Sequence, residues 1–322
     1  NSTRGWRTYG FNLWKISGRT DTWEKLMDEL TAAGIHRSDL RESYAECKRL
    51  NSLHGKTYYL ATLLLPKAKR PFVHALYGFA RYADEIVDDL ASELSVEEKA
   101  EVLSTWGNGV LADLKKGTSQ DHVGRALIDT VNRFHIPHEH FEAFLHSMTM
   151  DLTVQEYESY EDLIEYVYGS AAVIGLEMVP ILGPLHNDAF EAAKKLGIAF
   201  QLANFIRDVD EDLDRGRVYL PLKELGQFGV TREMLEERVL TPEIIEALKF
   251  QIARVRQLQA EAAPGIDMLE ASSRPCIEAA STLYCGIVDE VEKEYSSLSK
   301  EQEKRLQQRL ENLNSDDHKK WL

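Results

Sequence analysis

Helical periodicity is the feature that most constrains how this chain can fold. Apolar residues recur every three to four positions over long segments, as on the buried face of an α-helix, and no run shows the alternation typical of a β-strand. Several prolines, among them Pro66, Pro137 and Pro221, lie near breaks between these segments. We therefore predict helices at residues 21–33, 38–64, 71–91, 95–116, 121–134, 138–150, 160–182, 187–214, 231–238, 242–269 and 272–296.

The length and apolar content favour one large domain rather than several small ones. With 322 residues, of which 43% are apolar, the chain can bury a substantial core. We predict an all-α, single-domain helical bundle around a central cavity, formed by residues 26–314. An N-terminal extension, residues 1–25, precedes this domain, and the sequence does not establish whether the extension is ordered. A polar C-terminal tail, residues 315–322, follows the domain.

Charge and cysteine content exclude several classes of protein. A net charge of -15 leaves little basic surface for displacing counterions, so we predict no nucleic-acid partner. The three cysteines show no zinc-finger spacing, and their odd number favours a reducing compartment. We find no secretory signal and no apolar run near the ~20 residues of a membrane helix. A cytoplasmic protein is expected, and the basic, aromatic residues 1–20 leave a peripheral membrane contact open.

Two acidic motifs of matched spacing lie far apart in the sequence. In the first, "FARYADEIVDD" at 79–89, Asp84 and Asp88 are four residues apart, which sets them on one helix face about 6 Å apart. Arg81 precedes Asp84 by three residues and joins that face. Like charges at this spacing cost a helix a few tenths of a kcal/mol, so a cation is expected to offset them.

The second motif, "NFIRDVDEDLDRGRVYLP" at 204–221, repeats this pattern. Asn204, Asp208 and Asp212 follow at intervals of four, with Gln201 one turn earlier. Carboxylate and amide oxygens without Cys or His partners suit Mg²⁺, which commonly bridges carboxylates to substrate phosphates. We therefore expect two acidic walls that hold a diphosphate between them. Arg81, Arg207, Arg215 and Arg217 would neutralise its remaining oxygens. The alternative, for either motif alone, is a solvated helix face with salt bridges.

Several further motifs accompany these two. They are "HGKTYYLATLLLP" at 54–66, "ALYGFARYADEIVDD" at 75–89, "SMTMDL" at 147–152, "YVYGSAAVIG" at 166–175, the second acidic motif at 201–221 and "RPCIEAASTLY" at 274–284. Together they resemble the squalene/phytoene synthase family, most closely its bacterial phytoene synthases. The resemblance implies an isoprenoid-synthase-type helical bundle that binds Mg²⁺, with Mn²⁺ as a substitute, and a prenyl diphosphate.

The resemblance also assigns roles to individual residues. Asp84, Asp88, Asp208 and Asp212 match metal ligands, and Asn204 and Gln201 line the same wall, with Asn204 taken as a further ligand. His54, Arg81 and Arg207 match residues around the diphosphates, while Tyr166 and Tyr284 match tyrosines that face the reacting centre. Tyr77 lies one turn before Arg81 and joins its face by periodicity.

The family's reaction implies head-to-head condensation of two geranylgeranyl diphosphates to phytoene. A cyclopropylcarbinyl diphosphate is the intermediate, diphosphate is released, and downstream carotenoid enzymes are implied partners. Three alternatives stay open: a C30 synthase that makes dehydrosqualene or squalene from farnesyl diphosphate, a terpene cyclase on the same scaffold, and a catalytically inactive scaffold protein. Squalene formation would also require a nicotinamide reductant, whereas an inactive relative would be free to lose the metal ligands.

Two positions bear on the substrate. Thr62 lies two helical turns beyond His54, about 12 Å along the axis, and its small side chain favours a C20 tail over a C15 tail if it faces the cavity. The alternative is that Thr62 points at a neighbouring helix. Lys300 follows Tyr295 by five residues, where the family often has arginine. A lysine can neutralise a phosphate but lacks the bidentate fork of arginine.

Overall fold

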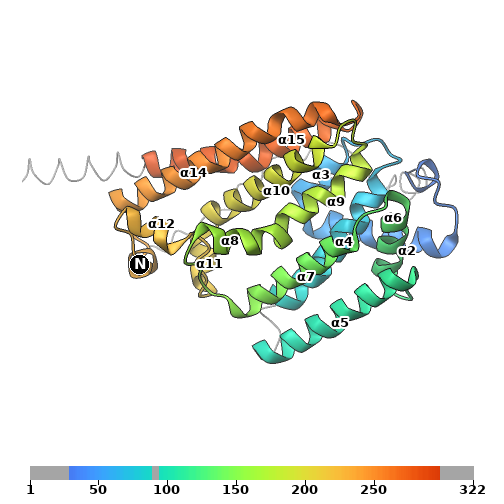
Figure 1. The fold of residues 1–322 in the computed structure, drawn as a ribbon, viewed down its shortest axis with the longest axis horizontal. Helices are drawn as coiled ribbons and strands as arrows, with labels where there is room; N and C mark the ends of the chain where they lie inside the picture. Colours follow the sequence, from blue (N-terminus) through green and yellow to red (C-terminus); the bar gives the residue numbers. More distant parts are fainter. Residues whose placement is uncertain (1–28, 89–93, 298–322) are drawn as a thin grey trace, which may run out of the picture.

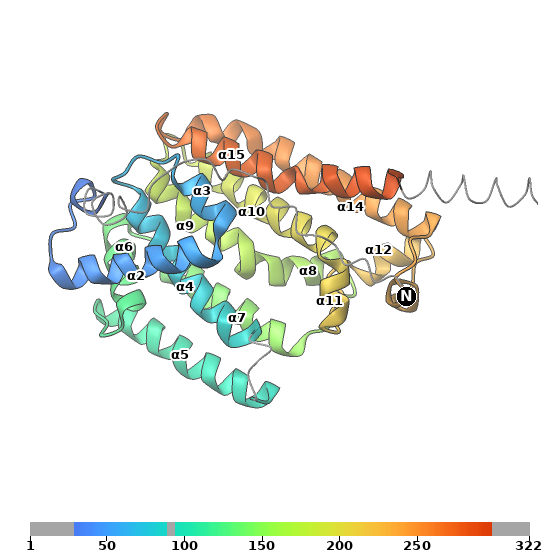
Figure 2. The same ribbon diagram turned by 180° about the vertical axis from the view of Figure 1, so that it is seen from behind.

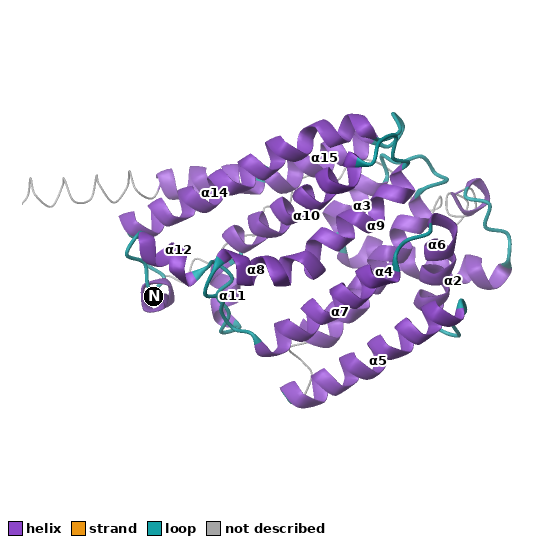
Figure 3. Cartoon of the chain, viewed as in Figure 1, coloured by secondary structure: helices purple, strands orange, loops and turns teal. Residues whose placement is uncertain are grey.

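A computed structural model describes residues 29–88 and 94–297, which form helices joined by short loops (Figures 1 and 3). Within these ranges there is no β-strand, only isolated bridges between Glu156 and Val218 and between Pro184 and Leu269. The all-α prediction is confirmed. The elements are α2 (Ser38–His54), α3 (Lys56–Thr62), α4 (Arg70–Asp88), α5 (Val96–Lys116), α6 (His122–Phe134), α7 (His138–Thr153), α8 (Tyr160–Val167), a π-helical turn η1 (Tyr168–Ala172), α9 (Val173–Leu182), α10 (Asp188–Arg207), α11 (Val209–Asp214), α12 (Leu222–Gln227), α13 (Arg232–Glu236), α14 (Pro242–Ala262), a 3₁₀ segment η2 (Ala263–Met268) and α15 (Arg274–Cys285).

The helices α4, α7, α9 and α10 form the middle of the bundle. On one side α10 packs against α9, α14 and α15, and on the other α4 packs against α2, α6 and α5. Both views show α14 and α15 along one edge of the molecule and α5 along the opposite edge (Figures 1 and 2). Since α4 and α10 carry the two acidic motifs, this arrangement sets the motifs on elements that flank the centre of the bundle.

Two apolar cores hold these layers together. The first includes Phe79 of α4 and Phe141 of α7, and the second includes Leu202 and Phe205 of α10. Phe200 packs against both cores. Burying apolar side chains such as these contributes about 1.5–3 kcal/mol each relative to exposure.

Local signals set several helix boundaries where the sequence predicts them. Ser95 accepts a hydrogen bond from the Glu98 backbone while the Glu98 side chain accepts one from the Ser95 backbone, which is a capping box at the start of α5. Gly117 ends the same helix in the left-handed conformation, with φ 78°. A second capping box, Ser159 with Asp162, begins α8. The predictions at 95–116 and at the start of 160–182 agree with these caps.

The predicted helix at 38–64 is wrong in one respect, because it is broken at Gly55. A Cβ there would lie 2.6 Å from Tyr77 Cε2 and 2.7 Å from Asn51 Oδ1. The chain thus passes so close to α4 that only glycine fits. The break lets α3 continue in a new direction, with Tyr58 packed at 5.6 Å between ring centroids from Tyr77.

The predicted helix at 187–214 is also interrupted. It ends at Arg207, and Asp208, with φ −97° and ψ 14°, separates α10 from the short α11. The Asp208 N–H still donates to the Asn204 carbonyl at 2.8 Å, and the Asp212 N–H donates to the Asp208 carbonyl at 2.8 Å. These bonds keep the motif residues in successive turns although the helix itself breaks. Further along, α12 was not predicted, and Gly286 interrupts the helix predicted at 272–296, which resumes at 287–297.

The predicted helix at 160–182 contains the π-helical turn η1, which changes the register between α8 and α9. The segment Tyr160–Leu182 is also long and apolar enough to cross a membrane, and 56% of its apolar window is buried in the fold. Burial to this extent is what a core helix shows. The extension predicted at 1–25 and the tail at 315–322 lie outside the described residues, as does most of the helix predicted at 21–33.

Substitution of Gly169 by alanine should destabilise the fold by about 1–3 kcal/mol, measured by urea unfolding, because it overpacks a closed contact. The new Cβ would lie 2.1 Å from the Ala143 carbonyl oxygen and 2.2 Å from Ser147 Oγ, which itself donates to the Tyr166 carbonyl. Gly109 is the matched control, since it is exposed within α5 and has open space around it. Gly109→Ala should be neutral or stabilising. Equal stability of both variants would contradict the close packing of η1 on α7.

Candidate active site

A cleft lies where the two apolar cores meet, and it encloses about 1140 Å³ of space, part of it open to solvent. Leu76, Phe144 and Met148 of the first core form one side, and Phe205 and Tyr219 of the second core form the other. Ten of the residues predicted from the sequence line this cleft together. They are Tyr77, Arg81, Asp84, Tyr166, Gln201, Asn204, Asp208, Asp212, Arg215 and Arg217.

The first acidic wall comes from α4. Arg81 Nη1 donates to Asp84 Oδ2 at 2.5 Å, and Arg81 Nη2 lies 3.3 Å from Glu85 Oε1. His54 Nε2, at the end of α2, lies 3.8 Å from the same Glu85 carboxylate. Arg81 therefore neutralises the acids of its own helix, while its buried Nε has no hydrogen-bond partner among the described residues.

The second acidic wall comes from the end of α10 and from α11. Arg207 donates two parallel hydrogen bonds to Asp208, from Nε to Oδ1 and from Nη2 to Oδ2, each of 2.6 Å. Asp212 lies one turn further along, half-buried, and Arg215 and Arg217 line the cleft beside it. Each wall thus pairs one motif carboxylate with one arginine.

The second wall is poised to accept a cation. Burial, with the neighbouring Asp208 carboxylate as the next cause, raises the pKa of Asp212 to about 7. Asn204 Oδ1 is buried and has no hydrogen-bond partner among the described residues. The Asn204 oxygen has no partner, and the charge of the Asp212 carboxyl is only partly offset by Arg215 and Arg217. Oxygen donors of this kind suit Mg²⁺ or Mn²⁺. The residues present therefore fit a divalent cation at this wall.

The two walls do not form a compact metal cluster by themselves. In the ranges that the structure describes, no three His, Cys, Asp or Glu side chains gather closely enough to hold one ion. Asp84 is paired with Arg81, and Asp208 is paired with Arg207. Magnesium usually completes its shell with waters and substrate phosphates rather than with protein ligands alone. Too few acidic ligands for one ion are therefore compatible with a magnesium site that a phosphate would complete.

The inner side of the cleft contains a buried carboxylate, that of Asp151, to which the sequence analysis assigned no role. Asp151, at 9% exposure, accepts hydrogen bonds of 2.7 Å from the Tyr166 hydroxyl and of 2.7 Å from the Tyr219 hydroxyl. Arg217 Nη2 donates to the Asp151 carbonyl at 2.9 Å. Burial first, and then the Asp151 charge, raise the pKa of both tyrosines. An acid within the apolar stretch "SMTMDL" was the signal that could have identified it.

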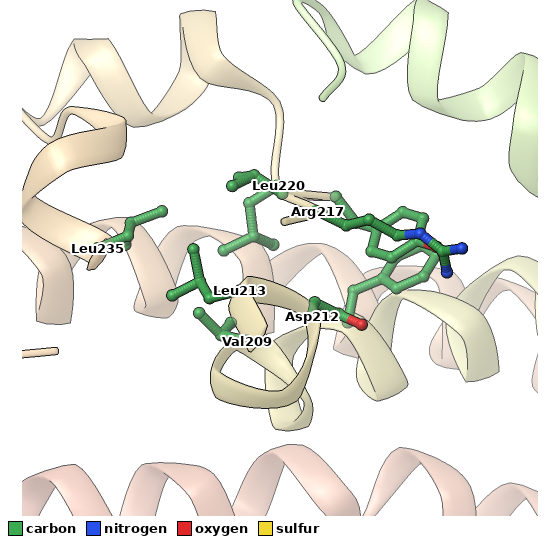
Figure 4. Close-up of a pocket in the computed structure, with 9 residues that line it drawn as sticks. Val209, Asp212, Leu213, Arg217, Leu220 and Leu235 are labelled. Atoms are coloured by element: carbon green, nitrogen blue, oxygen red, sulfur yellow. The ribbon is translucent and has the colours of Figure 1, made fainter. Parts of the chain in front are cut away.

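Apolar packing behind the second wall fixes its position. Figure 4 shows Val209 and Leu213 of α11 grouped with Leu220 and Leu235, while Asp212 lies on the other side toward Arg217. The short helix α11 is thus held by its apolar face and presents its acid to the cleft.

Four predicted site residues do not line the cleft. Thr62 is buried at 2% exposure and its hydroxyl donates to the Tyr58 carbonyl, so Tyr58 rather than Thr62 is the α3 residue in the cleft. Tyr284 stacks on Phe200 with ring centroids 4.8 Å apart. His54 and Arg207 flank the cleft through the ion pairs described above. The side chain of Asp88, at the end of α4, and the whole of Lys300 lie outside the described residues.

Comparisons with known proteins place the sequence among characterised families. The family profile described as squalene/phytoene synthase matches residues 52–310. Phytoene synthase 1, chloroplastic, of Arabidopsis thaliana is 36% identical over 269 residues, which cover 81% of this chain. The chain spans less than two thirds of that plant protein, 63% of its length. The 15-cis-phytoene synthase of Synechococcus elongatus is 34% identical over 267 residues, covering 79% of this chain and 85% of the cyanobacterial one.

Solved structures show the same architecture. The squalene synthase HpnC of Alicyclobacillus acidocaldarius superposes with a TM-score of 0.74 over 82% of this chain and 98% of its own, and its 24% identity supports the fold alone. A dehydrosqualene synthase in complex with a ligand superposes with a TM-score of 0.73 at 29% identity, over 79% of this chain and 88% of its own.

Proposed function

The chain belongs to the squalene/phytoene synthase family, and from this premise we propose that it joins two geranylgeranyl diphosphates head to head to give phytoene and diphosphate. One observation carries the proposal: a single cleft combines two acidic walls with an apolar, aromatic interior. The walls suit two diphosphates, and the interior suits two prenyl tails. The phytoene synthases of Arabidopsis and Synechococcus, at 36% and 34% identity, support this substrate over a shorter one.

The proposed cofactor is Mg²⁺, with Mn²⁺ as a substitute. Asp84 and Asp88 would hold it on the first wall, and Asn204, Asp208 and Asp212 on the second. When bound, the metal supplies Lewis-acid polarisation of the diphosphate leaving group as its C–O bond breaks. The orphaned Asn204 oxygen and the raised pKa of Asp212 support this assignment.

The arginines of the walls would bind the phosphates. Arg81 and Arg207 are paired with aspartates, and a diphosphate oxygen can replace each carboxylate as their partner. The exchange would leave Asp84 and Asp208 free to face the cation. His54, beside Glu85 at the mouth of the first wall, would supply a further contact to the diphosphate.

The interior of the cleft would protect the carbocations. Ionisation of one substrate gives an allylic cation, and the double bond of the second substrate captures it to form the cyclopropylcarbinyl diphosphate. A second ionisation, rearrangement and loss of a proton then give phytoene. Phe144, Tyr77 and Phe205 exclude water, and their rings stabilise positive charge. The hydroxyls of Tyr166 and Tyr219 donate hydrogen bonds to Asp151, so these two hydroxyls would not protonate the alkenes.

A C30 synthase that uses farnesyl diphosphate is the second candidate. The similarity to a dehydrosqualene synthase at 29% identity favours it. The argument from Thr62 for a C20 tail no longer applies, since Tyr58 occupies the cleft in its place. A terpene cyclase would use the same cleft with one substrate, whereas an inactive scaffold would have no need for the unpaired amide oxygen of Asn204 or for the crowded carboxyl of Asp212.

Incubation of the purified protein with Mg²⁺ and either geranylgeranyl or farnesyl diphosphate, without reductant, tests the proposal. We expect a C40 hydrocarbon from the C20 substrate, identified by mass spectrometry. A C30 hydrocarbon from farnesyl diphosphate alone would replace the proposal by the second candidate. A cyclic product from one substrate would indicate a cyclase, and no product from either substrate would contradict the proposed function.

The chemistry of the product indicates where in the cell the protein would act. Phytoene partitions into lipid, so we propose a cytoplasmic protein with peripheral membrane contact that passes its product to downstream carotenoid enzymes. The net charge of -15 supports a substrate held by metal rather than by a broadly basic surface.

A further inference from the structure

Glu177 is a buried acid that the proposed reaction does not use. It lies in α9 with an exposure of 0%, and both of its carboxyl oxygens lack a hydrogen-bond partner among the described residues. Burial alone raises its pKa well above the usual range for glutamate, which favours the neutral carboxylic acid over the carboxylate. A buried polar group without partners is costly, and a native structure that retains one calls for an explanation.

Glu177 lies just beyond the inner end of the cleft and is not among the residues that line it. Ser170 and Ile174 line the cleft from the same continuous helical segment, and Glu177 follows Ile174 by three residues, so it lies on the same face one turn further in. Its neighbour Met178 accepts a hydrogen bond of 3.3 Å from the hydroxyl of Tyr58, another residue of the cleft. Burial raises the pKa of the Tyr58 hydroxyl most, and the nearby groups that raise it further include Glu177.

We propose that Glu177 is a specificity-determining residue that forms a polar floor to the cleft and limits the length of the prenyl tail. This inference rests on the proposed function, because it assumes that the cleft takes prenyl tails. A tail that ends short of the floor leaves room for a trapped water, which can satisfy the carboxyl. A longer tail must displace that water and leave both oxygens facing methyl groups. The floor therefore discriminates by penalising the longer ligand rather than by attracting the shorter one.

The test measures binding rather than turnover. Thiolodiphosphates with C15, C20 and C25 tails, which do not ionise readily, are titrated into the full chain with Mg²⁺. The variants are Glu177→Leu, which makes the floor apolar at similar volume, and Glu177→Gln, which keeps a polar floor. For the wild type we expect a drop in affinity between two successive tail lengths. Leaving one or two buried oxygens unsatisfied corresponds to a drop of roughly 5- to 150-fold.

Glu177→Leu should remove most of this drop, while Glu177→Gln should retain it and the affinity for the shortest tail should stay unchanged. Equal drops in the wild type and in Glu177→Leu would overturn the proposal, as would a loss of the drop in both variants. If the binding data overturn the proposal but the wild type still makes C40 hydrocarbon, only the role of Glu177 is wrong and the proposed function stands. If the wild type binds no thiolodiphosphate, the proposed function and this inference fail together.

Infrared spectroscopy provides a second measurement that does not need the leucine variant to fold. The C=O stretch of the protonated carboxyl is assigned by its absence from Glu177→Gln. At saturating concentration, the shortest analogue that shows the drop in affinity should shift this band, because its tail displaces the water from the carboxyl, whereas a C10 analogue, too short to reach the floor, should leave the band in place. A band that stays unchanged with every analogue would show a purely structural acid and overturn the proposal.

Discussion

The Asp208→Asn variant should lose turnover by roughly 10²–10³-fold or more while its helical circular dichroism stays unchanged. Asp208 is held by two hydrogen bonds from Arg207, at the break between α10 and α11, and it lines the cleft. The substitution removes one negative charge from the proposed metal site but preserves the shape of the side chain. The expected loss therefore reports on charge, and it is measured as kcat for hydrocarbon formation at saturating Mg²⁺. Asp84→Asn should behave alike on the opposite wall.

Glu211→Gln is the matched control for this prediction. Glu211 is an exposed acid in the same short helix, and it does not line the cleft, so the same change of charge there should leave kcat within a few-fold of the wild type. If both variants lost activity equally, the effect would be one of overall charge near α11. If Asp208→Asn kept its turnover, the metal assignment for the second wall would be wrong.

The sequence was sufficient to predict the first acidic wall because its geometry is local. Tyr77, Arg81 and Asp84 recur at intervals of four and three, which sets them on one face wherever the helix is placed. Apolar periodicity likewise predicted most helices, since burial of one face is what keeps a helix in the fold. Capping residues such as Ser95 then placed boundaries close to those observed.

The helix breaks could not be predicted because their causes are tertiary. Gly55 is needed because Tyr77 approaches it from another helix, and nothing near Gly55 in the sequence carries that information. The register change in η1 accompanies the close contact of Gly169 with the backbone of α7. The inference about Thr62 failed for the same reason, because the break at Gly55 places Thr62 on a different helix from His54.

The roles of buried polar residues were the other feature that the sequence did not predict. Asp151 and Glu177 each occur within an apolar stretch, where helical periodicity treats a single acid as an interruption rather than as a site. Their environments differ, since Asp151 accepts two tyrosine hydroxyls and Glu177 has no hydrogen-bond partner among the described residues. Only the three-dimensional packing distinguishes an anchored carboxylate from a neutral acid.

Magnesium and the diphosphate should bind cooperatively, with each raising the affinity for the other by roughly 100-fold. Asp84 and Asp208 form ion pairs with Arg81 and Arg207, and in the described residues no three acids lie close enough to hold an ion. A diphosphate draws the arginines to its own oxygens and adds phosphate ligands for the metal. Each partner thus creates part of the site of the other.

With Mn²⁺ as the metal on both sides, equilibrium dialysis of geranylgeranyl thiolodiphosphate with and without Mn²⁺ measures one side of this coupling, and Mn²⁺ binding followed by electron paramagnetic resonance measures the other. Linkage requires the two factors to agree. Asp212→Asn should reduce both, because Asp212 supplies a half-buried carboxyl to the second wall, whereas the Glu211→Gln control should reduce neither. Mn²⁺ that bound as tightly without the analogue as with it would mean that the acidic residues form a complete metal site before substrate arrives. The arginine pairs would then be incidental to binding.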